Sequence, residues 1–165
     1  MTYFSRKTTR LPDYDYSGPG YYFITLCTKE KRKFLGEVVG TGLLDGPKVQ
    51  LSSYGEVAKA QLEQMADFYD TINLESYIVM PNHIHLLLRI QEKENMRTGR
   101  LSPTSSAIGK FVGTFKRFCN KRYGKNIWQM RSHDHVIRGE KDYLKIWSYI
   151  ENNAAKWQQD CFYME

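Results

Sequence analysis

Hydrophobic and polar positions alternate most clearly over residues 77–90, in the stretch YIVMPNHIHLLLRI. Pro81 and Asn82 are turn formers, so the stretch is predicted to form two short strands joined by a tight turn. Because side chains alternate across a strand, His83 and His85 share one face of the second strand. The opposite face, predicted to point into the core, consists of Ile84, Leu86, Leu88 and Ile90.

Apolar residues elsewhere recur with the period of amphipathic helices or cluster as in strands. Helices are expected over residues 53–69, 104–123 and 140–157, with a capping serine at Ser52 or Ser53. Extended segments are expected over residues 21–28, 34–39 and 126–138, with loops over 40–51 and 91–106. The order of elements predicts an α+β fold, an antiparallel sheet with helices packed mainly on one face. We expect one domain over residues 1–165, with an irregular N-terminal lead-in over residues 1–20.

Composition narrows the class of protein. A chain of 165 residues with 41% hydrophobic and 14% aromatic residues is typical of a globular domain. No apolar run approaches the ~18 residues of a membrane span, and the lead-in lacks the apolar stretch of a signal peptide. Cys27, Cys119 and Cys161 are scattered, which fits neither a disulfide framework nor a zinc cluster. We therefore expect a cytoplasmic protein.

The net charge of +6 is unevenly distributed along the chain. Residues 95–165 contain 13 Lys and Arg against 6 Asp and Glu, whereas residues 1–94 contain 11 against 12. Between Glu94 and Asp134 nine basic residues occur without an acidic one. A solvated surface normally mixes both signs, so this stretch favours a polyanionic partner such as nucleic acid.

Two further patterns indicate chemistry on phosphate. The paired histidines could hold a metal ion or polarise a phosphate, although such a pair can also be surface decoration. Tyr149 lies beside the apolar stripe of the last predicted helix, with Asn153 four residues later on the same helix face. A tyrosine can attack a phosphodiester and form a covalent intermediate, and the amide oxygen could complete a metal site. Tyr143, by contrast, lies on the apolar stripe and has no amide four residues later.

The motifs PNHIHLLLR, NIWQ, HVIRGEKDY, YIENN and KW, in this order over about residues 21–157, resemble the HUH single-tyrosine transposases. Within that family the chain most resembles the REP-associated tyrosine transposases and related insertion-sequence transposases. The resemblance implies a ferredoxin-like or RRM-like HUH fold and a divalent cofactor, Mg²⁺ or Mn²⁺. It further implies nicking and strand transfer of single-stranded DNA at hairpins, which leaves a 5′-phosphotyrosine and a free 3′-OH. Such relatives include both homodimers and monomers.

The resemblance also assigns residues one by one. His83 and His85 match the histidine pair, Tyr149 the nucleophile, and Asn153 the third metal ligand. Where relatives usually have Pro after that Asn, this chain has Ala154. The second predicted helix matches the DNA-facing helix only loosely, and the expected DNA-binding residues are Lys110, Lys116, Arg117, Lys121, Arg122 and Arg131.

Two alternatives stay open at the level of sequence. His133 and His135 form a second histidine pair, which we interpret as structural or DNA-contacting. A metal-dependent hydrolase could instead use both pairs, with water as nucleophile and Asp134 as a carboxylate ligand. A nucleic-acid-binding module without catalysis is the non-enzyme alternative, although no member of the expected catalytic set is missing.

Overall fold

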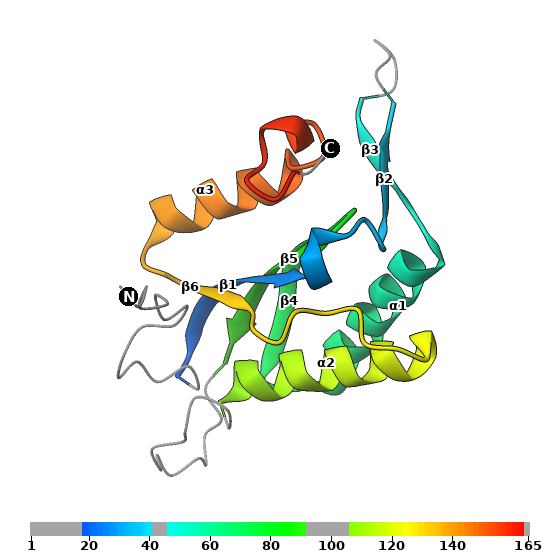
Figure 1. Ribbon diagram of the computed structural model, residues 1–165. Coiled ribbons are helices and arrows are strands. Elements are labelled where there is room, and N and C mark those ends of the chain that lie inside the picture. Colours follow the sequence, from blue (N-terminus) through cyan, green and yellow to red (C-terminus); the bar gives the residue numbers. More distant parts are fainter. Residues whose placement is uncertain (1–17, 41–45, 92–105, 164–165) are drawn as a thin grey trace, which may run out of the picture.

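The computed structural model describes residues 18–40, 46–91 and 106–163, and a four-stranded antiparallel sheet lies at its centre (Figure 1). Its strands are β1 (Gly20–Cys27), β4 (Ile72–Met80), β5 (His83–Ile90) and β6 (His133–Ile137), in the spatial order β4-β5-β1-β6. The turn at Pro81 and Asn82 joins β4 to β5, as predicted. A separate hairpin of β2 (Gly36–Val39) and β3 (Lys48–Leu51) extends to one side.

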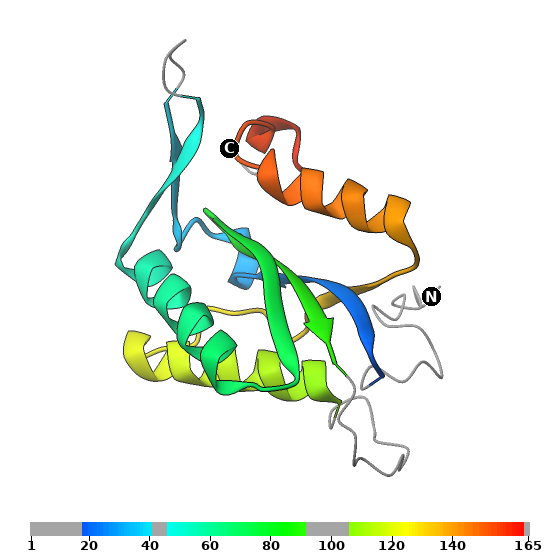
Figure 2. The ribbon, with the colours of Figure 1, turned by 180° about the vertical axis from the view of Figure 1, so that it is seen from behind.

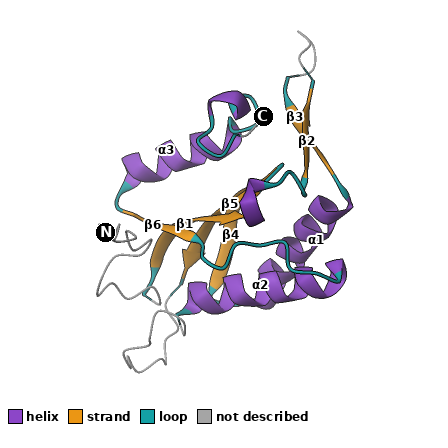
Figure 3. Cartoon of the chain, in the orientation of Figure 1, coloured by secondary structure: helices purple, strands orange, loops and turns teal. Residues whose placement is uncertain are grey.

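Helices cover both faces of the sheet. The helices α1 (Ser53–Phe68) and α2 (Ala107–Tyr123) pack together on one face, and α3 (Glu140–Glu151) lies on the other (Figures 1 and 3). The view from behind shows the same two layers around the sheet (Figure 2). The predicted α+β class, with most helices on one face, is therefore confirmed, and α3 is the helix on the opposite side.

The alternation along β5 divides the core into two parts. Ile84, Leu86, Leu88 and Ile90 are buried against α1 and α2, as the pattern predicts. Leu87 points the other way and packs with Ile137 and Ile150 under α3. His83 and His85 have the same strand parity as Leu87, so they lie on the α3 face. This register, and not the loops, determines which layer contains the histidines.

Local capping explains where α1 and α2 begin and where α2 ends. Ser52 Oγ accepts a hydrogen bond from Gly55 N at 3.2 Å, and Ser106 Oγ accepts one from Gly109 N at 3.0 Å. Each serine therefore satisfies an amide that has no partner within the first helical turn. Gly124, with φ 68°, ends α2 in the left-handed conformation that glycine adopts without strain.

Several predicted bounds differ from the structure. The predicted loop 40–51 contains β3, and the extended segment 126–138 forms a regular strand only over β6. The helix predicted over 140–157 ends at Glu151, because the chain continues through turns in which Asn153 N donates to Ile150 O and Trp157 N to Ala154 O. Such three-residue turns nearly preserve helical spacing, so the apolar pattern outlasts the helix. Most of the lead-in 1–20 and the predicted helix start at 104 lie outside the described residues.

Candidate metal and nucleophile site

The buried histidine pair is held by hydrogen bonds from neighbouring elements. Asn82 Nδ2 donates to Lys31 O at 3.0 Å and to Phe162 O at 2.8 Å, so its Oδ1 faces His83 Nδ1 at 2.8 Å. An amide oxygen only accepts, so His83 has its proton on Nδ1 and its lone pair on Nε2. Thr25 Oγ1 lies 2.9 Å from His85 Nδ1 on the adjacent strand β1.

The two histidines present their ring nitrogens to each other. His83 Nε2 and His85 Nε2 are 3.0 Å apart, and both side chains are essentially inaccessible to solvent. Burial lowers the pKa of both imidazoles, and for His85 the neighbouring His83 lowers it further. Both rings are therefore neutral near pH 7, the state in which an imidazole nitrogen binds a metal ion.

Tyr149 reaches this site from α3. Its ring centroid is 5.1 Å from that of His85, and 36% of the residue surface is exposed. Its hydroxyl donates to Asp160 Oδ2 at 2.9 Å. Burial, and then the hydrogen bond to this carboxylate, raise the pKa of Tyr149, so the resting side chain is a neutral phenol. The Tyr149 side chain is therefore partly open to solvent, whereas the two histidines are not.

Asn153 lies just beyond the end of α3 and is 2% exposed. Its Nδ2 donates to the same Asp160 oxygen at 2.9 Å. Its Oδ1 is buried and has no hydrogen-bond partner among the residues that the structure describes. Burying an amide oxygen unpaired costs about 1–3 kcal/mol, which marks this atom as available for a ligand.

Asp160 is a candidate site residue that the sequence did not reveal. Ligand atoms of His83, His85 and Asp160 lie within 4.8 Å of one another, a group that could hold a metal ion. Asp160 belongs to no recognised motif and lies beyond the last predicted helix. The available signal was weaker: it is one of few acidic residues in the basic half of the chain.

The C-terminal turn, residues 157–163, covers the histidine pair. The ring centroids of Trp157 and Phe162 lie 5.9 and 4.6 Å from that of His83. Lys31 Nζ donates to Cys161 O at 3.1 Å and lies 5.3 Å from the centroid of the Phe162 ring. The segment that contains Lys31 and the C-terminal turn therefore enclose the site.

The second histidine pair lies apart from this group. His133 and His135 are on β6, on the same sheet face, with Thr25 of β1 between His133 and His85. His135 Nε2 is 2.8 Å from Asp142 Oδ2, a contact that links β6 to the first turn of α3. Asp134 has the opposite strand parity and pairs in register with Ile24, whose side chain lies in the α1–α2 core. The structure thus does not bring Asp134 to His83 and His85.

The expected DNA-binding residues lie on the other layer. On α2, Lys110, Arg117, Lys121 and Arg122 are exposed, across the sheet from the histidine pair. Lys116 is partly buried and donates to Gln129 O at 2.8 Å, and burial lowers its pKa to about 8. Arg131 is exposed in the loop before β6.

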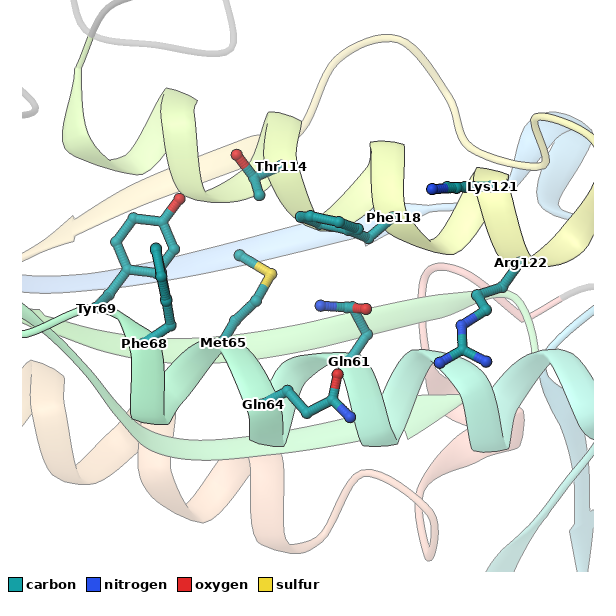
Figure 4. Close-up of a pocket in the computed structure, with 9 residues that line it drawn as sticks. All are labelled: Gln61, Gln64, Met65, Phe68, Tyr69, Thr114, Phe118, Lys121 and Arg122. Carbon is teal, nitrogen blue, oxygen red and sulfur yellow. The ribbon is translucent and has the colours of Figure 1, made fainter.

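A groove lies between α1 and α2, at a distance from the histidines (Figure 4). Its lining combines apolar, uncharged polar and cationic side chains: Gln61, Gln64, Met65, Phe68, Tyr69, Thr114, Phe118, Lys121 and Arg122. Phe68 is 79% exposed and lies at the end of the groove away from Lys121 and Arg122 (Figure 4). In the part of the chain that the structure describes, no helix is long and apolar enough to cross a membrane.

Known proteins resemble this chain in both sequence and fold. No protein-family model matches the chain. It is 32% identical to an uncharacterized protein of Haemophilus influenzae, over 97% of this chain and 94% of the other. It is 25% identical to a candidate REP-associated tyrosine transposase of the same organism, over 86% of this chain and 74% of the other.

A solved structure of a REP-associated tyrosine transposase bound to a REP hairpin has the same fold. It superposes with a TM-score of 0.64 at 21% identity, over 90% of this chain and 73% of the other. The fold, the named relative and the ordered sequence motifs, among them PNHIHLLLR and YIENN, therefore point to the same kind of protein. The chain is similar in sequence to a candidate REP-associated tyrosine transposase over most of its length, and it has the fold of a REP-associated tyrosine transposase.

Proposed function

We propose that this protein nicks single-stranded hairpin DNA and transfers the cut strand through a covalent bond to Tyr149, with a divalent metal ion. The observation that carries the proposal is the convergence of Tyr149 and Asn153 on one carboxylate beside two buried, neutral histidines. The related transposase whose structure includes a REP hairpin supports a hairpin as substrate. The family supports transposition as the biological outcome.

The donor set fits a divalent cation. His83 Nε2, His85 Nε2 and Asn153 Oδ1 are the proposed ligands, and a carboxylate oxygen of Asp160 lies close to the two histidines. Mn²⁺ accepts imidazole and oxygen ligands, and Mg²⁺ prefers oxygen. A cation held there would polarise the scissile phosphate and offset the charge that develops during transfer. The hydrogen bond from His83 to Asn82 orients one imidazole for this role.

Tyr149 provides the nucleophile. Its phenolic oxygen attacks phosphorus and forms an O–P bond while the bond from phosphorus to the 3′ oxygen breaks. The phenolic proton ends on the leaving 3′ oxygen, so the products are a 5′-phosphotyrosine and a free 3′-OH. Attack of another 3′-OH on the phosphotyrosine restores Tyr149 and joins the strands. No water is consumed, which distinguishes this reaction from hydrolysis.

We infer that the exposed cations of α2 bind the DNA backbone away from the cut. Lys110, Arg117 and Lys121 are separated by seven and four residues, so they lie on one side of α2, here named the outer basic row. Arg122 and Arg131 provide further positive charge. Lys116 is the exception, because carbonyl oxygens of the loop before β6 already accept from its ammonium group.

A covalent-adduct assay tests the proposal. Hairpin DNA labelled on the 3′ side of the cut should migrate with the denatured protein in Mn²⁺, and EDTA should abolish the band. Tyr149→Phe should remove the adduct, and Tyr143→Phe, on the same helix, should retain it. An adduct that survives in Tyr149→Phe would refute the nucleophile, and equal cleavage in EDTA would refute the metal role.

A further inference from the structure

Asp160 contacts both functional side chains that α3 and its C-terminal end contribute. Its Oδ2 accepts from Tyr149 OH and from Asn153 Nδ2, each at 2.9 Å. Its Oδ1 accepts from Phe162 N at 2.7 Å. Three donors thus occupy a carboxylate that offers about four acceptor positions. Little of its binding capacity remains for a metal ion of its own.

The contact with Asn153 has a geometric consequence. A side-chain amide can present either its oxygen or its NH₂ group to a given neighbour, and only the oxygen binds a cation. Because a carboxylate accepts and never donates when ionised, Asp160 selects the orientation in which Nδ2 faces it. The Asn153 oxygen then lies elsewhere, buried and without a partner.

We propose that Asp160 is a positioning residue. It fixes the amide of Asn153 so that the amide oxygen faces the metal site, and it holds Tyr149 at a constant separation from that site. The inference rests on the proposed metal site and adds to it a residue that lies outside the motifs PNHIHLLLR and YIENN. Partners that orient a metal ligand typically change metal affinity by about 10–100-fold when removed. Asp160 acts through Asn153 and not as an independent ligand.

A double-mutant cycle on Mn²⁺ affinity, measured by calorimetry without DNA, separates these two roles. Asp160→Ala and Asn153→Ala should each weaken Mn²⁺ binding about 10-fold or more. The double variant should bind within about 2-fold of Asn153→Ala, because Asp160 has no effect once its amide partner is gone. Losses that multiply to ~100-fold would show an independent ligand and overturn the proposal, as would unchanged affinity in Asp160→Ala.

Two further variants guard against a loss of fold. Asp160→Asn keeps the shape and a carbonyl oxygen for Asn153 Nδ2, so it should bind Mn²⁺ within about 3-fold of wild type. A loss as large as in Asp160→Ala would mean that the negative charge itself binds the ion, and would overturn the proposal. Asp142→Ala removes a carboxylate that contacts His135 instead, and its Mn²⁺ affinity should be unchanged.

Failure of the metal site itself would be visible separately. His85→Ala should abolish tight Mn²⁺ binding, and wild-type affinity in this variant would refute the proposed function. The side-chain amide resonances of Asn153, recorded in EDTA, test the Asp160 contact without any metal. They should shift in Asp160→Ala and stay in place in Asp142→Ala; resonances that ignore Asp160→Ala would overturn the positioning role.

Discussion

Asn82→Ala should weaken metal binding and destabilise the protein together, because one buried amide serves both purposes. Asn82 is fully buried, donates to Lys31 O and Phe162 O, and accepts from His83 Nδ1. A typical hydrogen bond contributes a net ~1 kcal/mol, so losing all of them should lower the free energy of unfolding by about 3 kcal/mol. Domains are stable by about 5–15 kcal/mol, so the variant should still fold.

Metal affinity should change for a different reason. Without the Asn82 oxygen, His83 has no partner that keeps its proton on Nδ1, and the ring can rotate or change tautomer. Loss of such a supporting contact typically reduces metal affinity by about 10–100-fold. The effect on affinity is thus predicted from orientation alone, since Asn82 is not a proposed ligand.

Urea unfolding in EDTA and Mn²⁺ calorimetry measure the two effects separately. With a slope of about 2 kcal/mol/M, the urea midpoint should fall by ~1.5 M. Asn152→Ala, which removes an exposed amide that donates to Ser148, is the matched control and should change both quantities little. Wild-type Mn²⁺ affinity in a folded Asn82→Ala protein would refute the argument that Asn82 sets the orientation of His83.

Two more predictions concern charge. Replacing the three residues of the outer basic row with Gln should flatten the slope of log K against log salt for hairpin binding by about 2. Lys116→Gln should leave this slope unchanged. The reverse result would refute the assignment of the outer basic row to the DNA backbone. Burial lowers the pKa of His83 and His85 below 6.5, so below that pH the unfolded chain binds more protons than the folded one. The free energy of unfolding of the metal-free protein should therefore fall as pH drops from 7 to 5, and His85→Gln should reduce this pH dependence. Equal pH profiles for the wild type and His85→Gln in urea unfolding would contradict the prediction.

Local patterns in the sequence predicted most of the elements, though not β3, and much of the candidate set. The alternation around the turn at Pro81 and Asn82 predicted β4, β5 and the shared face of the two histidines, because a strand has a period of two whatever surrounds it. The spacing of Tyr149 and Asn153 placed them near each other, because residues four apart remain neighbours through a turn. The ordered motifs pointed to the family.

Long-range packing decided the rest. No periodicity states that α3 crosses to the sheet face opposite α1 and α2, or that α3 ends at Glu151 and the chain folds back over the histidines. Asp160 became a candidate site residue only through that return. We exclude Lys116 from the proposed DNA-binding residues only because the loop before β6 accepts from its ammonium group. The sequence by itself determined which residue types can act on phosphate. The tertiary structure decided which of them meet, because contacts between distant segments depend on the packing of whole layers and not on local spacing.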